Sequence, residues 1–383
     1  MTAESLQIDI IRDPVALEPI LSAWDDLAAA AACPGGLSGW QLAWWRTLAQ
    51  PGSSLCVVVV RDGERVAGIA PYAVQQQGGR TTYRLLAAPM THRVAPVARP
   101  EEAAAVLTAV AGALAHADPA PHVVALDGVD ADAAWPQALA AGWPGGRRPW
   151  GLIERRQPAP YVDLVHDDYD AWLQARSKNF RQQARRFRRR LEAAGGTIRM
   201  TRTLDEAQRD VPAFVRLHHA RWEGRGGSSL GQDVGAMLLE AASAMLADER
   251  FRLWIVEVDG EPVGAQLFLA AGEEALYWNG GFDEAHAELR PALLGLLAGI
   301  EDCIARGERR LDLGGGGHEY KLRLADGDRP LVWGALVPRG SGYLRSRASL
   351  LPQQLGAGAR AAVARMPPET QERVRAARAR LSR

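Results

Sequence analysis

The sequence repeats one pattern of predicted elements, and this repeat limits the folds that the chain can adopt. Two Asp-Gly turns, Asp62-Gly63 and Asp259-Gly260, each join two runs rich in β-forming residues, as in a β-hairpin. A third strand, a helix and a buried strand follow each hairpin, and the two turns lie 197 residues apart. A pattern that recurs at a nearly fixed spacing indicates two copies of one structural unit.

Each copy is expected to form a mixed sheet, because an antiparallel hairpin precedes its helix and a single strand returns after it. The helix of the second copy illustrates the pattern, with Pro291 near its first turn and Gly307 at its end. We therefore predict an α/β (mixed) fold of tandem repeats, each a mixed, mostly antiparallel sheet flanked by helices. The predicted domains are residues 1–165 and 166–338, followed by a basic C-terminal tail at 339–383.

Composition and hydropathy argue against the membrane and disulfide-rich classes of protein. The longest apolar runs, such as residues 55–60, are too short to span a bilayer, and the first residues are acidic where a signal peptide is basic. The three cysteines, at positions 33, 56 and 303, have neither the spacing of a zinc site nor that of a disulfide framework. We expect a cytoplasmic protein without a transmembrane segment and without a metal.

The net charge of zero conceals two strongly basic segments. Residues 176–190 hold eight basic side chains and no acidic one, and the tail at 339–383 holds ten basic and two acidic residues. The rest of the chain is therefore acidic and would repel a polyanion. We expect the tail from Ser341 onward to be dispensable, with little of it buried in the core, although its charge could give a weak contact with a membrane surface.

The first basic segment has the pattern of a helix. Ser177 is a suitable N-cap, and a pair of glycines at 195–196 closes the segment. Its apolar residues recur at the spacing of one helix face: Phe180, Ala184, Phe187 and Leu191. Most of its arginines are then expected to form a solvated face. Lys178 and Arg181 differ, since they lie at the helix start, which beside a cleft is a natural site for an anionic group.

Four segments together resemble those of a known family: "SGWQLAWW" from position 38, "SKNFRQQARRFRRRLEAAGG" from 177, "LHHARWEGRGG" from 217 and "LDLGGGGHEYKLRLA" from 311. In this order they resemble the CelD/BcsL-type acetyltransferases, whose tandem domains have the N-acetyltransferase (GNAT) fold. The likeness covers residues 8–338. The related FemABX ligases use the same pair of domains to move amino acids from aminoacyl-tRNA onto peptidoglycan precursors.

The resemblance implies that the chain is an N-acyltransferase built from tandem GNAT-like repeats. It would move an acyl group, acetyl above all, from acyl-CoA to an amine. The acceptor would be a small molecule, a sugar or a component of the cell envelope, bound between the two repeats.

The resemblance also implies where acetyl-CoA would lie. In this family its pyrophosphate contacts the start of the central helix, where this sequence has Arg290 but no glycine pair, and where Glu284 and Glu288 are nearby. The run of glycines after the last strand would let the co-substrate approach the backbone closely. The candidate cofactor-binding residues are Arg290, Gly314, Gly315 and Gly316.

The catalytic residues are expected in the second copy, next to the glycine run. Acyl transfer to an amine needs a base, a donor to the developing oxyanion and an acid for the leaving group. The candidates for these roles are Asp312, His318, Glu319, Tyr320 and Lys321. By this resemblance, Tyr320-Lys321 corresponds to an aromatic-Lys pair of the FemABX relatives. In those relatives the lysine is thought to stabilise the tetrahedral intermediate.

The substrate is expected to lie between the two copies. The candidates for binding it are Lys178, Arg181, Arg221, Trp222, Tyr277 and Asn279. The first copy has neither a glycine run nor an aromatic-Lys pair after its last strand. We therefore expect a degenerate GNAT-like domain at 1–165, which shapes the acceptor side of the cleft, and a catalytic domain at 166–338.

Two other functions stay open. Aminoacyl transfer from a charged tRNA would use the basic helix and the basic tail to hold RNA phosphates, and tRNA is a partner only under this interpretation. A non-catalytic binding protein, in which both copies have lost activity, would explain the missing pyrophosphate loop.

Overall fold

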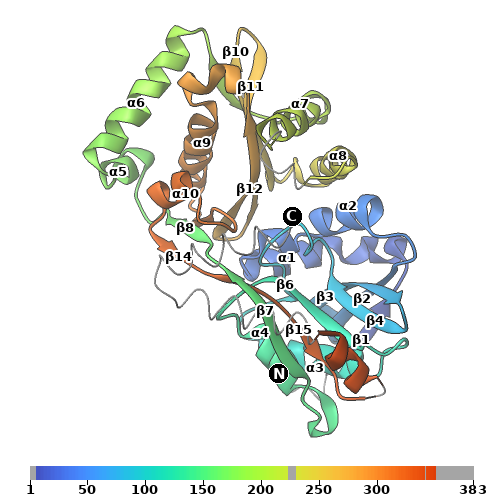
Figure 1. Ribbon diagram of the computed structural model, residues 1–383. Helices are drawn as coiled ribbons and strands as arrows, with labels where there is room; N and C mark the ends of the chain where they lie inside the picture. Colours follow the sequence, from blue (N-terminus) through green and yellow to red (C-terminus); the bar gives the residue numbers. More distant parts are fainter. Residues whose placement is uncertain (1–5, 223–229, 341, 351–383) are drawn as a thin grey trace, which may run out of the picture.

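The computed structural model describes residues 6–222, 230–340 and 342–350, and it contains two units, each built on one sheet (Figure 1). The strands of the first sheet, in the order in which they pair, are β1 (Gln7–Ile11), β2 (Ser54–Asp62), β3 (Arg65–Gln77), β4 (Arg80–Leu85), β6 (Val123–Asp130), β15 (Leu331–Val337) and β7 (Trp150–Gln157), with β5 (Val97–Ala98) beside β3. The helices of this unit are α1 (Leu21–Ala30), α2 (Ser38–Leu48), α3 (Ala103–Ala115) and α4 (Trp135–Ala141).

The second unit is centred on a sheet of seven strands. In pairing order these are β14 (Gly327–Asp328), β8 (Pro160–Asp163), β13 (Arg310–Asp312), β12 (Glu274–Phe282), β11 (Glu261–Ala271), β10 (Phe251–Val258) and β9 (Thr197–Met200). Its helices are α5 (Tyr169–Gln174), α6 (Lys178–Ala193), α7 (Leu204–Trp222), α8 (Val234–Met245), α9 (Pro291–Ala305) and α10 (Glu319–Leu324). Figure 1 shows α9 on one face of this sheet and α7 and α8 on the other. None of the described helices has the length and apolar character that a membrane crossing requires.

Both units contain the predicted elements in the predicted order. The hairpins β2–β3 and β10–β11 close at the two Asp-Gly turns. In each unit the strand that follows the hairpin pairs in parallel with the strand after the central helix, α3 or α9: β4 pairs with β6, and β12 pairs with β13. The predicted mixed α/β fold, with two mostly antiparallel sheets flanked by helices, is confirmed.

The two sheets exchange strands across the predicted domain boundaries. β8 lies before residue 165 but pairs with β13 of the second sheet, and β15 lies before residue 338 but pairs with β6 and β7 of the first sheet. The two crossings bond to each other, since the amide of Arg329 donates to the carbonyl oxygen of Ala159 at 3.0 Å. A single cut at residue 165 therefore does not separate the sheets.

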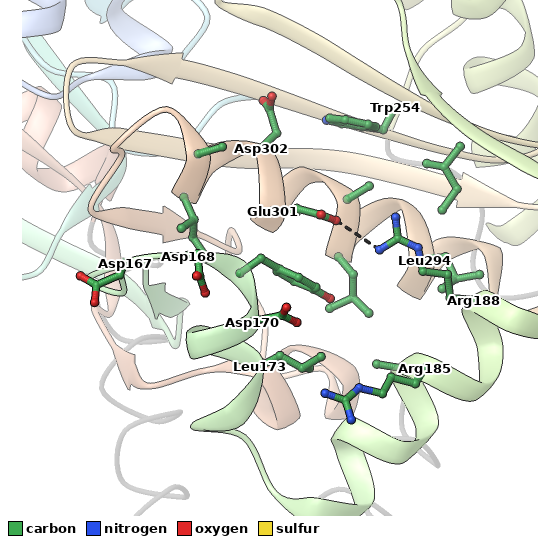
Figure 2. A pocket seen from close by; sticks show the side chains of 17 residues that line it. Asp167, Asp168, Asp170, Leu173, Arg185, Arg188, Trp254, Leu294, Glu301 and Asp302 are labelled. Carbon is green, nitrogen blue, oxygen red and sulfur yellow. Dashed lines mark hydrogen bonds and ion pairs between the residues drawn. The ribbon is translucent and has the colours of Figure 1, made fainter.

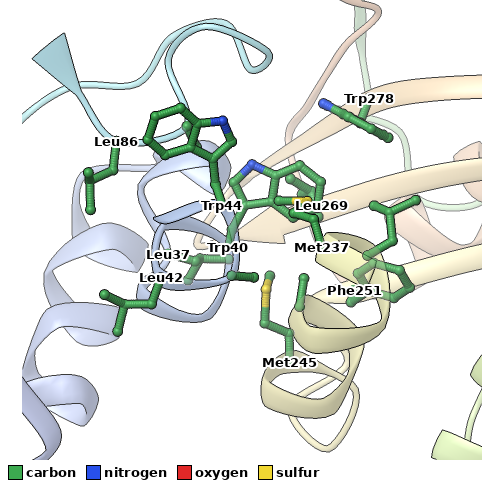
Figure 3. Packing of buried hydrophobic residues seen from close by; sticks show 14 of the residues in the cluster. Leu37, Trp40, Leu42, Trp44, Leu86, Met237, Met245, Phe251, Leu269 and Trp278 are labelled. Carbon is green, nitrogen blue, oxygen red and sulfur yellow. The ribbon is translucent and has the colours of Figure 1, made fainter. Parts of the chain in front are cut away.

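One hydrophobic cluster joins the two units (Figure 3). Trp40 on α2 is fully buried and meets the edge of Trp278 on β12, with ring centroids 5.1 Å apart. The face of α2 also packs against Met237 and Met245 of α8. Because both units bury apolar surface in this cluster, each unit is stabilised by the other.

The second unit also reaches the first through a tight turn. Gly272, between β11 and β12, has φ +59°, and a Cβ atom there would collide with the backbone carbonyl oxygen of Ala29 at the end of α1. We expect Gly272→Ala to lower the free energy of unfolding by roughly 3 kcal/mol or more, because left-handed strain and a clash with backbone add. Urea unfolding measures this change.

Gly260→Ala is the matched control for that substitution. Gly260 lies in the neighbouring hairpin turn of the same sheet, has φ +82° and has no atom near its missing Cβ. The strain alone should cost about 1 kcal/mol at this position. Equal losses of unfolding free energy in the two variants would show that the contact with α1 does not contribute to stability.

The basic segment forms α6 as predicted. The Ser177 hydroxyl accepts the amide of Phe180 at 3.2 Å, and Gly195 follows the helix with φ +68°. The apolar face of α6 packs against the rest of the second unit. Its buried side chains are Ala184, Phe187 and Leu191. The arginine face is largely exposed, so this segment is a helix with one packed side.

The beginning of the tail packs on the first unit. Leu350 is buried beside Val337 of β15, and the guanidinium of Arg347 lies 4.6 Å from the ring centre of Trp150. Of residues 342–350 only Ser346 and Leu350 are buried, and Leu344 is 78% exposed, so little of this part of the tail lies in the core, as expected. Residues 351–383 lie outside the described residues.

Candidate active site

The glycine run opens a wedge between two parallel strands. β12 and β13 pair only over Glu274–Leu276 and Arg310–Asp312, and β12 then continues to Phe282 without that neighbour. After β13 the chain turns away, with Gly314 at φ +73° and Gly316 at φ +101°. Backbone of this kind favours glycine, which explains why the run follows this strand.

A cavity of about 290 Å³ lies at this wedge, between the two units. Eight of the predicted site residues line it: Arg221, Tyr277, Asn279, Gly314, Gly315, His318, Tyr320 and Lys321. The first unit contributes Pro89, Met90 and His92. Among the described residues that line the cavity there is no carboxylate side chain.

Lys321 is the cation at the centre of the site. Its side chain is buried, with 7% of the residue exposed, and its ammonium donates to the carbonyl oxygens of Gly315 at 3.0 Å and Gly314 at 3.4 Å. Burial lowers the pKa of Lys321 to about 8, the charge of Asp312 acts against this shift, and the charge of Arg221 adds to it. Lys321 is therefore mostly charged at neutral pH but close to titration.

Two phenols and an arginine line the same cavity as this ammonium. The Tyr277 hydroxyl donates to the Gln266 side-chain oxygen at 2.7 Å, and the Arg221 guanidinium lies 5.6 Å from the ring centre of Tyr320. Burial raises the pKa of Tyr277 well above its ordinary value and also raises that of Tyr320. Both phenols therefore stay protonated near neutral pH, so they can donate hydrogen bonds but cannot act as bases there.

The other predicted catalytic residues lie at different depths. Asp312 is buried behind the cavity, where its carboxylate accepts the amide of Gly314 at 2.8 Å and pairs with Arg93. His318 is exposed at the mouth and stacks on Tyr320, with ring centroids 6.1 Å apart. Burial, Lys321 and Arg221 lower the pKa of His318. Glu319 does not line the cavity, because its side chain is 80% exposed and pairs with Arg323 one helical turn later.

Several predicted binding residues lie away from this cavity. Lys178 is exposed at the start of α6, and the guanidinium of Arg181 donates to the carbonyl oxygens of Gln174 and Arg176. Arg181 therefore closes the turn between α5 and α6, and neither residue lines the cavity. Gly316 is also outside the lining. The side chain of Trp222 lies outside the described residues.

His92 is a cavity residue that the sequence did not reveal. Its Nδ1 accepts the amide of Gly315 at 3.3 Å, and burial lowers its pKa to about 4. The imidazole is therefore neutral at physiological pH, with Nδ1 as acceptor and Nε2 as donor. Its local sequence carries no motif, and only the packing of the two units brings it to the glycine run.

The start of α9 does not form the usual pyrophosphate cradle. Its first residue is Pro291, which has no amide hydrogen, and the preceding Arg290 has φ +57°. The Arg290 side chain lies over Phe187 of α6, 5.9 Å from the ring centre. This helix start offers one cation and no glycine pair, with two glutamates in the preceding turn, so it fits acyl-CoA poorly.

A larger cavity, of about 790 Å³, lies between α5, α6 and α9 (Figure 2). The guanidinium of Arg188 pairs with the carboxylate of Glu301 at 3.4 Å in its lining, which also includes the acidic side chains of Asp167 and Asp170. It contains none of the predicted catalytic residues. The smaller cavity at the wedge, which eight of the predicted site residues line, is therefore the candidate active site.

Comparisons with known proteins concern the family and the fold of this chain. A family model described as acetyltransferase (GNAT) domain matches residues 178–322. FemX has a similar structure at 13% identity, over 88% of this chain and 100% of FemX, with a TM-score of 0.62. The C-terminal domain of a predicted lysylphosphatidylglycerol synthetase from Agrobacterium fabrum is similar at 10% identity, over 87% and 96%, with a TM-score of 0.53.

A conserved protein of unknown function from Bacteroides thetaiotaomicron is similar at 14% identity, over 86% of this chain and 100% of that chain, with a TM-score of 0.52. No curated protein sequence gives a significant match. At these identities the solved structures show the fold alone. Residues 178–322 of the second unit therefore match the model of a GNAT acetyltransferase domain, and the chain has the two-unit fold of FemX.

Proposed function

We propose that this protein is an N-acyltransferase, and that its acceptor amine belongs to a small molecule, a sugar or a cell-envelope component bound between the two units. The observation that carries the proposal is the position of Lys321, which places a buried ammonium at the wedge of the splayed strands. A cavity that is rich in hydrogen-bond donors and is lined by no described carboxylate suits the negative charge of a tetrahedral intermediate.

The chain's own residues supply the remaining roles in this mechanism. The acceptor amine attacks the acyl carbonyl carbon, a carbon–nitrogen bond forms, and the bond to the donor's leaving group then breaks. Lys321 holds the oxyanion, with Tyr320 as a second donor. The neutral imidazole of His318 takes the proton from the amine and then returns it to the leaving group. His92 and Asp312 fix the glycine run whose carbonyls hold Lys321. Arg221 and Asn279 orient the substrate.

The mechanism predicts a loss of activity at alkaline pH. Lys321 works as an ammonium, so its contribution is present below its pKa of about 8 and is lost as pH rises through that value. We expect kcat/KM to fall about tenfold for each pH unit above the pKa of this group in the free enzyme. A profile from pH 6 to 10 measures this. The residual activity of Lys321→Ala should lack that descending limb, and a limb that persists there belongs to another group.

The donor is proposed to be acyl-CoA, which GNAT domains generally use. Calorimetry with CoA and acetyl-CoA, at two salt concentrations, tests this. Binding of acetyl-CoA that Arg290→Ala weakens would support this donor and a pyrophosphate contact at the start of α9.

Aminoacyl-tRNA is the second candidate donor, and the poor fit of the α9 start to a pyrophosphate favours it. The exposed arginines of α6 would then hold RNA phosphates. Bulk tRNA in the same calorimeter should bind in a steeply salt-dependent way under this alternative, because each phosphate contact releases counterions. Binding of neither donor would contradict both forms of the proposal and leave a non-catalytic binding protein.

A further inference from the structure

A loop of the first unit lies between the two sheets and bonds to both of them. This bridging loop, residues 89–94, accepts the Trp278 indole N–H at the carbonyl oxygen of Met90, 3.0 Å away. The Thr91 hydroxyl accepts the indole N–H of Trp40 at 2.8 Å. The loop thus fixes its next two residues, His92 and Arg93, against the second unit.

Arg93 is the residue of this loop that makes the most ionic contacts. It has φ +61°, an uncommon conformation for a residue with a side chain, and its side chain is only 10% exposed. The guanidinium pairs with Asp312 of the second unit and with Asp130 of the first, and it donates to the carbonyl oxygen of Arg329 at 2.9 Å. A buried cation with this many partners is held firmly in place.

The carboxylate of Asp312 interacts with two cations, Arg93 and Lys321. Its side chain is 3% exposed, its second oxygen accepts the amide of Gly314, and its charge also acts on the ammonium of Lys321. Lys321 instead donates to the carbonyl oxygens at the glycine run. The other titratable or charged groups that face this ammonium are His92, His318, Tyr277, Tyr320 and Arg221. Asp312 is therefore the carboxylate that could draw Lys321 away from the cavity.

We propose that Arg93 is a positioning residue for Lys321. By pairing with Asp312, Arg93 keeps that carboxylate from forming its own ion pair with the ammonium, which then stays on the carbonyl oxygens of Gly314 and Gly315 and faces the cavity. The first unit acts on the chemistry of the second in this way, without touching the substrate. The inference rests on the proposed function in one respect, namely that Lys321 is the group that holds the oxyanion.

The amino-acid composition makes a direct test practical. Lys178 and Lys321 are the only lysines in the chain, one exposed and one buried, so the exposed amine serves as an internal reference. Trace acetic anhydride labels only neutral amines, and mass spectrometry of the two peptides at a series of pH values gives an apparent pKa for Lys321. This measurement needs no substrate and no turnover, so its result is independent of whether the proposed reaction is correct.

In Arg93→Gln the apparent pKa of Lys321 should rise by at least about one unit, since a freed carboxylate favours the charged amine. The labelling of Lys321 relative to Lys178 at pH 7 should then fall about tenfold. Arg46→Gln is the matched control, because Arg46 forms another ion pair between the units, with Glu240 at 2.7 Å, and does not line the cavity. It should leave the titration of Lys321 unchanged.

Circular dichroism shows whether Arg93→Gln folds. If it does not, two further variants still test the proposal. Asp312→Asn alone should lower the apparent pKa of Lys321, and the double variant Arg93→Gln/Asp312→Asn should lack the rise expected of the single arginine change. An unchanged or lowered pKa in folded Arg93→Gln would overturn the proposal, as would a rise of the same size in the double variant.

Discussion

Replacing Lys321 with alanine should lower turnover by roughly 100- to 1,000-fold, the scale of losing one donor to an oxyanion. The ammonium is buried at the cavity, and it gains most from the charge that develops in the transition state. The fold and the affinity for the donor should stay close to normal. Steady-state kinetics with an amine that the protein acylates, together with calorimetry of the donor and thermal unfolding, measure these effects.

Two variants accompany this change. Lys321→Arg should restore little of the activity, because a planar guanidinium cannot place its charge where a compact ammonium lies between two carbonyl oxygens. Lys178→Ala removes the other lysine and should affect at most the Michaelis constant for the acceptor. The mechanism is wrong if folded Lys321→Ala keeps its turnover, and a variant that unfolds would instead make Lys321 structural.

Replacing Trp40 with alanine should lower the free energy of unfolding by about 3–5 kcal/mol, the range for large buried aromatic residues. The ring is fully buried between the units, contacts Trp278 and donates a hydrogen bond to the bridging loop. The cavity left behind would lie in the cluster that holds the two units together. Urea denaturation followed by circular dichroism measures the loss.

Trp45→Ala is the matched control for the Trp40 change. Trp45 lies on the same helix and only borders the cluster, so its replacement should cost no more than about half as much. Comparable losses would show that α2 itself, and not the contact between units, determines stability.

The sequence predicts well those features that depend on near neighbours in the chain. The Asp-Gly hairpins, the capped helix α6 and the glycine run after β13 each follow from local conformational preferences, and all appear in the structure. The neighbouring residues Tyr320 and Lys321 likewise reach one cavity. Their roles were inferred from the resemblance to the aromatic-Lys pair of the FemABX relatives, and their adjacency in the chain keeps them together in the fold.

Features that depend on distant segments could not be predicted in this way. His92 and Arg93 gain their roles from Gly315 and Asp312, more than 200 residues away. Arg181 looked free at a helix start, but the turn before α6 brings backbone carbonyl oxygens to its guanidinium. Glu319 follows the glycine run, but it begins α10 and its side chain leaves the site.

The return of β15 to the first sheet has a consequence for synthesis on the ribosome. The sheet that begins with residue 7 has a gap between β6 and β7 until residues 331–337 have been made. The first unit therefore cannot complete its sheet until the whole second unit has been synthesised. Until then the edges of β6 and β7 stay open to pairing with other strands. Refolding from denaturant should accordingly show one concerted late step for both sheets, and translation pauses before residue 331 should expose the chain to aggregation and to chaperones.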